Sequence, residues 1–311
     1  MSLDLGAAAA VLELPYVTRA ESLARHTTMR VGGPAAIWAQ PDTIEEVAEL
    51  LRRVHTAGLP LFVLGVGSNL VVADTGFDGV VLHLGKGFET SRVEGPILTA
   101  GGAAYLPKLT KFALDHHLGN LEWACGVPGS LGGSLWGNAG ARGFNGQDVE
   151  GRDCAADFAN CLAFERDGTA RRLGRGDVEF GYRRSNLGSL IVVEASFALK
   201  PLTPEAVKRH REAVRDLLER RRATQPANAA SAGCIWKNPA GCAGAGALVE
   251  AAGLKGASHH GAEVSTVHGN FVINAGGATA RDLMELIERV EHAVLEGTGI
   301  QLEREARFLG W

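Results

Sequence analysis

One segment of this chain constrains its fold more than any other, because six of the fifteen residues from Gly126 to Gly140 are glycine. The segment reads GVPGSLGGSLWGNAG. Glycine lets the main chain turn sharply and approach a neighbour closely, at a cost in conformational entropy. With so few side chains, we expect the segment to build no core, and long loops in compact domains are uncommon unless they serve function. The pattern favours a main chain that lies against a flat or anionic ligand.

A second glycine turn, GVGSNL at 65–70, directly follows a short apolar run. Leu70 stands where a dinucleotide fingerprint would have its third glycine, and the Lys-Ser/Thr pair of a P-loop is missing. Converging backbone N–H groups, together with the side chains of Ser68 and Asn69, suit a pyrophosphate. For this turn on its own, a plain strand-to-turn connection without a ligand remains the alternative.

Composition excludes several classes of protein. The net charge of −4 offers no basic field for a nucleic-acid backbone. No run approaches the roughly 18 apolar residues of a membrane span, and residues 1–14 lack the basic stretch of a signal peptide. The five cysteines form no C-x-x-C pair, which indicates reduced thiols in the cytoplasm rather than a disulfide frame or a zinc site. We therefore expect a cytoplasmic protein with no metal, no nucleic-acid partner and no membrane association.

Periodic patterns predict alternating helices and strands through the first two hundred residues. Thr43 and Glu46 have the spacing of a capping box, and the apolar stripe behind them predicts a helix over 43–57. Thr203 with Pro204 begins another helix that runs to about residue 222. A further helix is expected at 106–117, and strands at 61–65, 80–84 and 97–100. This alternation favours a mixed α/β or α+β domain. The long helix that begins near residue 203 marks a candidate domain boundary.

The C-terminal hundred residues contain the clearest local pattern. Thr279 and Asp282 cap a helix that glycines end at 297–299. Residues 300–308 then alternate between apolar and polar types, which predicts a half-buried strand. Its polar face would present Glu303, Glu305 and Arg307. Without other information, a solvated sheet face explains these charges more simply than a catalytic one.

Several motifs, in chain order, resemble those of the UDP-N-acetylenolpyruvoylglucosamine reductase family. They are TMRVGGP (28–34), GVGSNL (65–70), the glycine segment (126–140), FGYRRS (180–185), SAGCIWKNP (231–239), AGLKG (252–256), HGNF (268–271) and EREARF (303–308). The resemblance spans about residues 26–309. It implies an α+β protein whose FAD-binding fold is of the vanillyl-alcohol-oxidase (PCMH) type. The implied parts are FAD-binding subdomains at 1–85 and 86–202 and a C-terminal α+β substrate-binding domain at 203–311.

The resemblance also implies a reaction. FAD would be reduced by NADPH, and a hydride from flavin N5 would reduce UDP-N-acetylglucosamine enolpyruvate to UDP-N-acetylmuramate for peptidoglycan synthesis. Cys234 would protonate the intermediate, while Arg183 and Glu305 would stabilise it. A guanidinium is a natural partner for charge that develops on a carboxylate. Glu305 can help only if it is protonated or hydrogen-bonded, so burial would have to raise its pKa.

Binding residues follow from the same resemblance. Those implied for FAD are Arg30, Gly32, Gly65, Gly67, Ser68, Asn69, Gly126, Pro128, Gly129, Gly132, Gly133, Asn138 and Gly140. Those implied for the UDP-sugar substrate are Tyr182, Lys237, Asn238, His268 and Asn270. The run 220–222, three arginines, suits either a helix C-terminus or a diphosphate.

The chain departs from the family pattern in three places. Cys234 stands where the proton donor is usually serine, and Trp136 stands where methionine is frequent. No tyrosine-bearing loop is inserted between Arg183 and the helix near residue 203, which indicates the family's shorter type. Two other functions stay open. Another FAD-dependent oxidase or dehydrogenase of this fold would not need Arg183, Cys234 and Glu305 together, and neither would a non-catalytic nucleotide-binding module.

Overall fold

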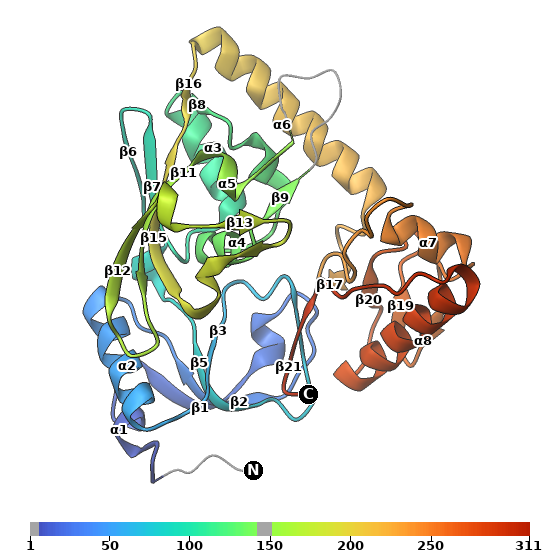
Figure 1. Ribbon diagram of the computed structural model, residues 1–311, viewed down its shortest axis with the longest axis horizontal. Coiled ribbons are helices and arrows are strands. Elements are labelled where there is room, and N and C mark those ends of the chain that lie inside the picture. The colour runs from blue at the N-terminus through green and yellow to red at the C-terminus, as the bar shows by residue number, and fades with distance from the viewer. Residues whose placement is uncertain (1–5, 142–150) are drawn as a thin grey trace.

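Figure 1 shows the computed structural model of the chain as three lobes. The structure describes residues 6–141 and 151–311. The first five residues of the segment that was compared with a signal peptide therefore lie outside the described residues. The first lobe is drawn in blue, the second mainly in green and yellow, and the third in orange and red. Helix α6 (Pro204–Thr224) runs from the second lobe to the third. Every lobe mixes helices with strands, which confirms the predicted α+β class.

The first lobe is a four-stranded sheet in the order β1-β2-β5-β3, with α2 packed against it. Its elements are α1 (Ala9–Leu12), β1 (Val17–Ser22), β2 (Pro34–Ala39), α2 (Ile44–Thr56), β3 (Leu61–Val63), β4 (Leu70–Val72) and β5 (Phe77–Leu82). The predicted helix is confirmed with its capping box. Thr43 Oγ1 accepts a bond from Glu46 N at 3.2 Å, and the Glu46 carboxylate accepts from Thr43 N at 3.2 Å.

The second lobe is built on a five-stranded antiparallel sheet in the order β12-β11-β15-β7-β6. Its strands are β6 (Ser91–Glu94), β7 (Ile97–Gly101), β11 (Phe158–Phe164), β12 (Ala170–Gly174) and β15 (Ile191–Ala198). Its helices are α3 (Leu106–Asp115), α4 (Leu131–Trp136) and α5 (Cys154–Asp157). Short pairs complete it: β8 (Leu118–Gly119) with β16 (Lys200–Pro201), β9 (Gly140–Ala141) with β10 (Arg152–Asp153), and β13 (Phe180–Gly181) with β14 (Arg184–Ser185).

The glycine segment is partly helical, so the expectation that it builds no core is wrong. Helix α4 begins after Ser130, whose hydroxyl accepts a bond from Gly133 N at 3.4 Å. Leu131 and Leu135 are both fully buried in the core of the second lobe. Two leucines four residues apart are enough to bury one side of a short helix, while Gly132, Gly133 and Trp136 of the same helix line a cavity.

The third lobe has its own antiparallel sheet in the order β17-β20-β19-β18 and two helices that pack against one another. Its elements are β17 (Ala230–Ser231), α7 (Ala245–Ala251), β18 (Ser258–His259), β19 (Ala262–Val264), β20 (Val272–Asn274) and α8 (Ala280–Thr298). The predicted cap of α8 is confirmed by Thr279 and Asp282, and the helix ends at Gly299 in a left-handed conformation. Helix α6 is confirmed too, with Thr203 as its cap and Pro204 in its first turn.

The long strand expected over 300–308 is wrong. Only β21 (Arg307–Leu309) forms, and it pairs in parallel with β4 of the first lobe. Before it, Arg304 makes a single bridge to Trp236. Burial still alternates, with Leu302 and Ala306 buried and Glu303 exposed. The alternation of buried and exposed side chains is therefore confirmed, but most of this stretch forms no strand. It connects the third lobe to the first, where β21 pairs with β4. The domain limits at residues 85 and 202 stay predictions.

Candidate active site

A cavity of about 1580 Å³ is lined by residues from all three lobes. Ligand sites usually measure roughly 300–1,000 Å³, so this one has room for a large cofactor and a second ligand. Both glycine segments line it, as do Arg221 of α6 and Cys234 and Glu305. In the described part of the chain, no cluster of His, Cys, Asp and Glu could hold a metal ion, and no helix is long and apolar enough to cross a membrane.

The turn at 65–69 forms a cradle of backbone donors. Gly67 has a φ of +65°, and a β-carbon there would lie 2.2 Å from the carbonyl oxygen of His26. Among the described residues, the N–H groups of Val66, Gly67 and Ser68 have no acceptor. Ser68 Oγ donates to the carbonyl oxygen of Pro128 at 2.6 Å, which ties the two glycine segments together. Consecutive N–H groups without an acceptor, in residues that line the cavity, suit the pyrophosphate of a dinucleotide.

Most residues predicted for the cofactor lie on the cavity wall, and three do not. Those on the wall are Arg30, Gly65, Gly67, Ser68, Asn69, Pro128, Gly129, Gly132, Gly133 and Gly140. Gly32 instead packs on β4, because a β-carbon there would lie 2.5 Å from that of Val72. Gly126 lies against the Arg221 side chain, since its β-carbon would be 2.4 Å from Arg221 Cδ. Asn138 is buried, and its amide donates to the carbonyl oxygen of Gly181 at 3.0 Å.

Arg183 and Glu305, which are 122 positions apart, form an ion pair in the cavity. Arg183 Nε donates to Glu305 Oε1 at 2.6 Å, and a second guanidinium nitrogen donates to Gly140 O at 3.3 Å. Arg183 also has a φ of 57°, an uncommon conformation for a residue with a side chain. The neighbouring Arg184 is exposed. Of the two neighbouring arginines, Arg183 therefore lies in the site and Arg184 at the surface.

Burial shifts the pKa values of both acidic groups of the site upward. Burial raises the pKa of Glu305, although Arg183 and Lys237 oppose the shift. Burial also raises the pKa of the Cys234 thiol to about 11, and the Glu305 carboxylate adds to this while Arg183 lowers it. The Cys234 side chain thus stays a thiol at neutral pH and keeps a proton that it can donate.

The strip that follows Cys234 is held between two other segments. Glu305 N donates to the carbonyl oxygen of Ile235 at 2.7 Å, and Lys237 N donates to that of Glu303 at 2.8 Å. From the opposite side, Asn270 bonds to both Ile235 and the main chain of Trp236. The thiol and the carboxylate are therefore linked through one short stretch of backbone.

The five residues predicted for the substrate fall into two groups. Asn238, His268 and Asn270 line the cavity. Tyr182 is 57% exposed and lies over the Arg183 guanidinium, and the Lys237 ammonium forms an ion pair with Glu303. Neither of these two lines the cavity as described.

Arg221 is a cavity residue that sequence reasoning did not single out. Burial lowers the pKa of its guanidinium, and among the described residues it has no carboxylate partner. Removing a charge from water without a counter-charge is costly, so Arg221 is suited to an anionic ligand. A signal was present, because Arg221 follows the buried Leu217 by four residues and so shares its helix face.

Comparisons with known proteins find the same family along nearly the whole chain. Residues 35–151 match the FAD binding domain family, and residues 225–309 match the C-terminal domain of UDP-N-acetylenolpyruvoylglucosamine reductase. The UDP-N-acetylenolpyruvoylglucosamine reductase of Heliobacterium modesticaldum is 42% identical over 292 residues, which cover 93% of this chain and 90% of that protein. Reductase 2 of Symbiobacterium thermophilum is 42% identical over 296 residues, which cover 94% and 92%.

A solved structure agrees as well. The crystal structure of the reductase from Thermus caldophilus superimposes with a TM-score of 0.77 at 33% identity, covering 94% of this chain and 98% of that chain. The predicted fold, an FAD-binding part followed by a C-terminal α+β domain, is thereby confirmed. The chain is an FAD-dependent oxidoreductase. It belongs to the family of UDP-N-acetylenolpyruvoylglucosamine reductases.

Proposed function

We propose that this protein uses NADPH to reduce UDP-N-acetylglucosamine enolpyruvate to UDP-N-acetylmuramate. One observation carries the proposal: the Arg183–Glu305 pair and the Cys234 thiol line the same cavity as the glycine cradle. A cavity of this size can take a dinucleotide and a UDP-sugar. Bound FAD would supply the hydride, which it takes from NADPH. We expect the protein to be located in the cytoplasm, where thiols stay reduced.

Arg183 and Glu305 would act on the carboxylate of the enolpyruvyl group. Hydride addition to the terminal carbon leaves negative charge on the adjacent carbon and on that carboxylate. A guanidinium already fixed at 2.6 Å from Glu305 needs no reorganisation to meet this charge. Burial raises the pKa of Glu305, which makes it easier for this carboxyl group to take up a proton when negative charge develops beside it.

Cys234 would then complete the reaction. Its S–H bond breaks, the proton forms a new C–H bond at the carbon that carries the ether oxygen, and the thiolate is left behind. The thiolate is compensated by Arg183 and Arg221, the two cations that act on it. Solvent reprotonates it before the next turnover.

The substrate's diphosphate has candidate partners on the same wall. Arg221 has no carboxylate partner among residues 6–141 and 151–311, and Asn238 and His268 also line the cavity. The side-chain oxygen of Asn238 accepts a bond from Ala245 N at 3.1 Å, so the side-chain NH₂ is the part that can donate to a ligand.

Stopped-flow kinetics under anaerobic conditions test the proposal. NADPH should bleach the flavin absorbance, and UDP-N-acetylglucosamine enolpyruvate should restore it with one equivalent of UDP-N-acetylmuramate formed. Another FAD-dependent oxidase or dehydrogenase of this fold would instead be bleached by a small alcohol or sugar and would ignore the enolpyruvyl compound. That result would replace the proposed function with the alternative one.

A further inference from the structure

Asn270 makes three hydrogen bonds to two consecutive residues of the strip that follows Cys234. The carbonyl oxygen of Asn270 accepts from Ile235 N at 2.9 Å, and its side-chain oxygen accepts from Trp236 N at 2.9 Å. Its side-chain amide donates to the carbonyl oxygen of Trp236 at 2.8 Å. The side chain thus behaves like one more peptide group of a neighbouring strand.

The opposite edge of the same strip carries the bonds to the segment with Glu305. The Ile235 carbonyl accepts from Glu305 N at 2.7 Å, and Lys237 N donates to Glu303 O. Residues 235–237 therefore lie between Asn270 on one side and residues 303–305 on the other. Cys234 is attached directly to this strip, just after Gly233, whose φ is +74°.

We infer that Asn270 is a positioning residue, which fixes the Cys234 thiol relative to Glu305, and not a substrate contact. The inference rests on the proposed function of these two groups. Although Asn270 borders the cavity, it is only 3% exposed. Turning its amide toward a ligand would break both bonds to Trp236, and a buried polar group without a partner costs about 1–3 kcal/mol.

Asn270 is itself held in place by His268. Asn270 N donates to His268 Nδ1 at 3.1 Å, a bond that a neutral imidazole can accept. Burial lowers the pKa of His268; of the charged groups that face it, Lys255 adds to the shift and Glu250 opposes it. A neutral His268 and a fixed Asn270 are therefore expected across the neutral range.

Removal of the Asn270 amide should leave the lobe folded, because the strip has other attachments. Trp236 is fully buried, and its indole N–H donates to Glu291 of α8 at 2.9 Å. The same carboxylate binds the Arg304 guanidinium, at 2.7 Å for each of two nitrogens. These contacts hold the Trp236 side chain, and the Asn270 carbonyl still accepts from Ile235 N, but only the Asn270 side chain bonds the main-chain N–H and carbonyl of Trp236.

Two substitutions at Asn270 separate positioning from substrate binding. For Asn270→Ala, we expect the limiting rate of enolpyruvyl reduction to fall ~10²-fold, the scale of a small misplacement of a reacting group. The dissociation constant of the substrate should not change. Iodoacetamide alkylation of Cys234, followed by mass spectrometry, should show a thiol that ionises at lower pH than in the wild type, because a displaced thiol is less buried. The charges that face it are Glu305, Arg183 and Arg221.

Asn270→Asp adds a test within a single protein sample. A protonated carboxyl group can both accept from Trp236 N and donate to Trp236 O, as the amide does, while a carboxylate cannot donate. The limiting rate of this variant should therefore recover as the pH falls. Asn274 offers a matched control, since its side chain likewise bonds only backbone groups, those of Gly276, Ala278 and Met29, whereas the Asn270 side chain bonds two. Asn274→Ala and Asn274→Asp should keep the wild-type rate and show no such recovery.

Other outcomes overturn the inference. A weaker dissociation constant for the substrate, with an unchanged limiting rate, would make Asn270 a substrate contact. A low rate for Asn270→Asp that does not recover at any pH would remove the positioning role. Cys234→Ala tells the two failures apart. If it stalls while the Asn270 variants behave as wild type, only the positioning role fails; if it turns over normally, the proposed function of the thiol fails first.

Discussion

Cys234 differs from the other four cysteines in being both largely shielded from water and on the cavity wall. Cys125, Cys154 and Cys161 are buried away from the cavity, and Cys242 is exposed. Because burial raises the pKa of Cys234 to about 11, the thiol form dominates below this pH and is lost above it. The rate of enolpyruvyl reduction should therefore hold from neutral pH and fall as the pH rises through about 11.

Two variants check this assignment. Cys234→Ser should keep measurable activity and lose the alkaline limb, because an alcohol does not ionise in this range. In the Cys234→Ala variant, NADPH should still reduce the flavin, but the reaction should stall before product forms. Single-turnover absorbance traces with product analysis measure both halves, and Cys242→Ser serves as the control. Normal turnover by the alanine variant would leave Cys234 as a packing residue.

The Arg183–Glu305 pair makes a second prediction at this scale. Arg183→Ala and Glu305→Ala should each slow the reaction of the reduced enzyme with the enolpyruvyl substrate by ~10²-fold or more, the scale of losing one preorganised electrostatic group. Reduction by NADPH should change far less, because no substrate carboxylate is present at that stage. Rapid mixing of each reactant separately measures the two rates.

The chain offers matched controls for both members of the pair. Arg184 follows Arg183 in sequence but is exposed, and Glu303 is 71% exposed on the same segment as Glu305. Arg184→Ala and Glu303→Ala should therefore leave both rates close to those of the wild type. Equal slowing of the two half-reactions in the site variants would point to damaged FAD binding and would count against a role in stabilising the intermediate.

At the scale of elements, local signals predicted local structure. The capping boxes of α2 and α8 and the Thr203 cap of α6 all form, because a cap needs only residues three positions apart. The strand expected at 300–308 failed because strand formation needs a partner, and β21 finds it in β4, more than 230 positions away. The candidate catalytic residues were reached through motifs, while Arg221 was missed because the run 220–222 was considered as a whole and not by its spacing from Leu217 on the helix face.

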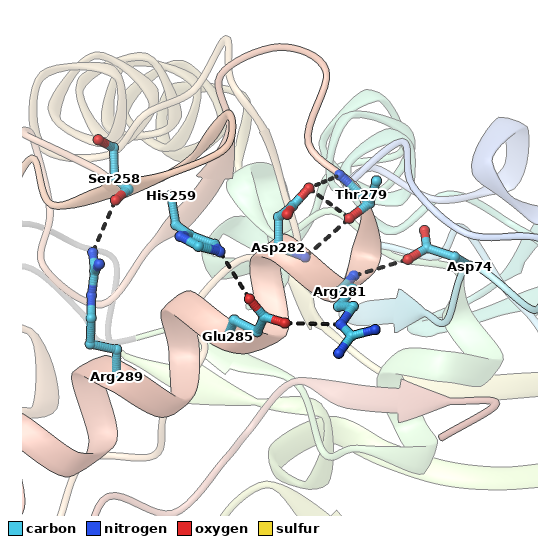
Figure 2. Close-up of polar contacts among 8 residues, drawn as sticks. All are labelled: Asp74, Ser258, His259, Thr279, Arg281, Asp282, Glu285 and Arg289. Atoms are coloured by element: carbon cyan, nitrogen blue, oxygen red, sulfur yellow. Dashed lines mark hydrogen bonds and ion pairs between the residues drawn. The ribbon is translucent and has the colours of Figure 1, made fainter.

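The start of α8 carries a contact that no local pattern could predict. Asp74, in the turn after β4, accepts bonds from Ala280 N at 2.9 Å and Arg281 N at 3.0 Å, and Figure 2 shows it facing the first turn of the helix. Thr279 and Asp282 cap the same turn from within the third lobe. A carboxylate beside a helix N-terminus is favourable, so Asp74 stabilises α8 from another lobe.

Substitution of Asp74 should therefore loosen the third lobe. Asp74→Ala should lower the free energy of unfolding by about 1 kcal/mol, the usual cost of losing a cap. Hydrogen exchange should speed up at the amides of Ala280 and Arg281, as measured by mass spectrometry or NMR. Glu45→Ala removes an exposed acidic residue from the first turn of α2 and serves as the control. Unchanged exchange at both amides would show that the internal capping box suffices.

At the scale of the whole molecule, three lobes share one ligand cavity, and their cores meet at the borders between lobes. The core of the third lobe also includes Met29 and Val71 of the first, and β21 pairs with β4. A ligand that touches every lobe should make them unfold together. Addition of FAD to the apoprotein should thus merge the thermal transitions into one and stabilise the fold by about 2.7 kcal/mol at a hundredfold excess over the dissociation constant. Calorimetry over a series of FAD concentrations measures this shift.

Alanine substitutions at Gly67 and Gly95 test whether stabilisation by FAD depends on the glycine turn at 65–69. Both have left-handed backbones, with φ of +65° and +59°, so alanine strains each by about 1 kcal/mol. A β-carbon at Gly67 would meet the carbonyl oxygen of His26 at 2.2 Å, whereas at Gly95 it would meet nothing within 4 Å. Gly67→Ala must therefore shift the turn, whose residues line the cavity, and its response to FAD should be greatly weakened. Gly95→Ala should be slightly less stable but should gain as much from FAD as the wild type, and equal gains by both variants would contradict a cofactor role for the turn.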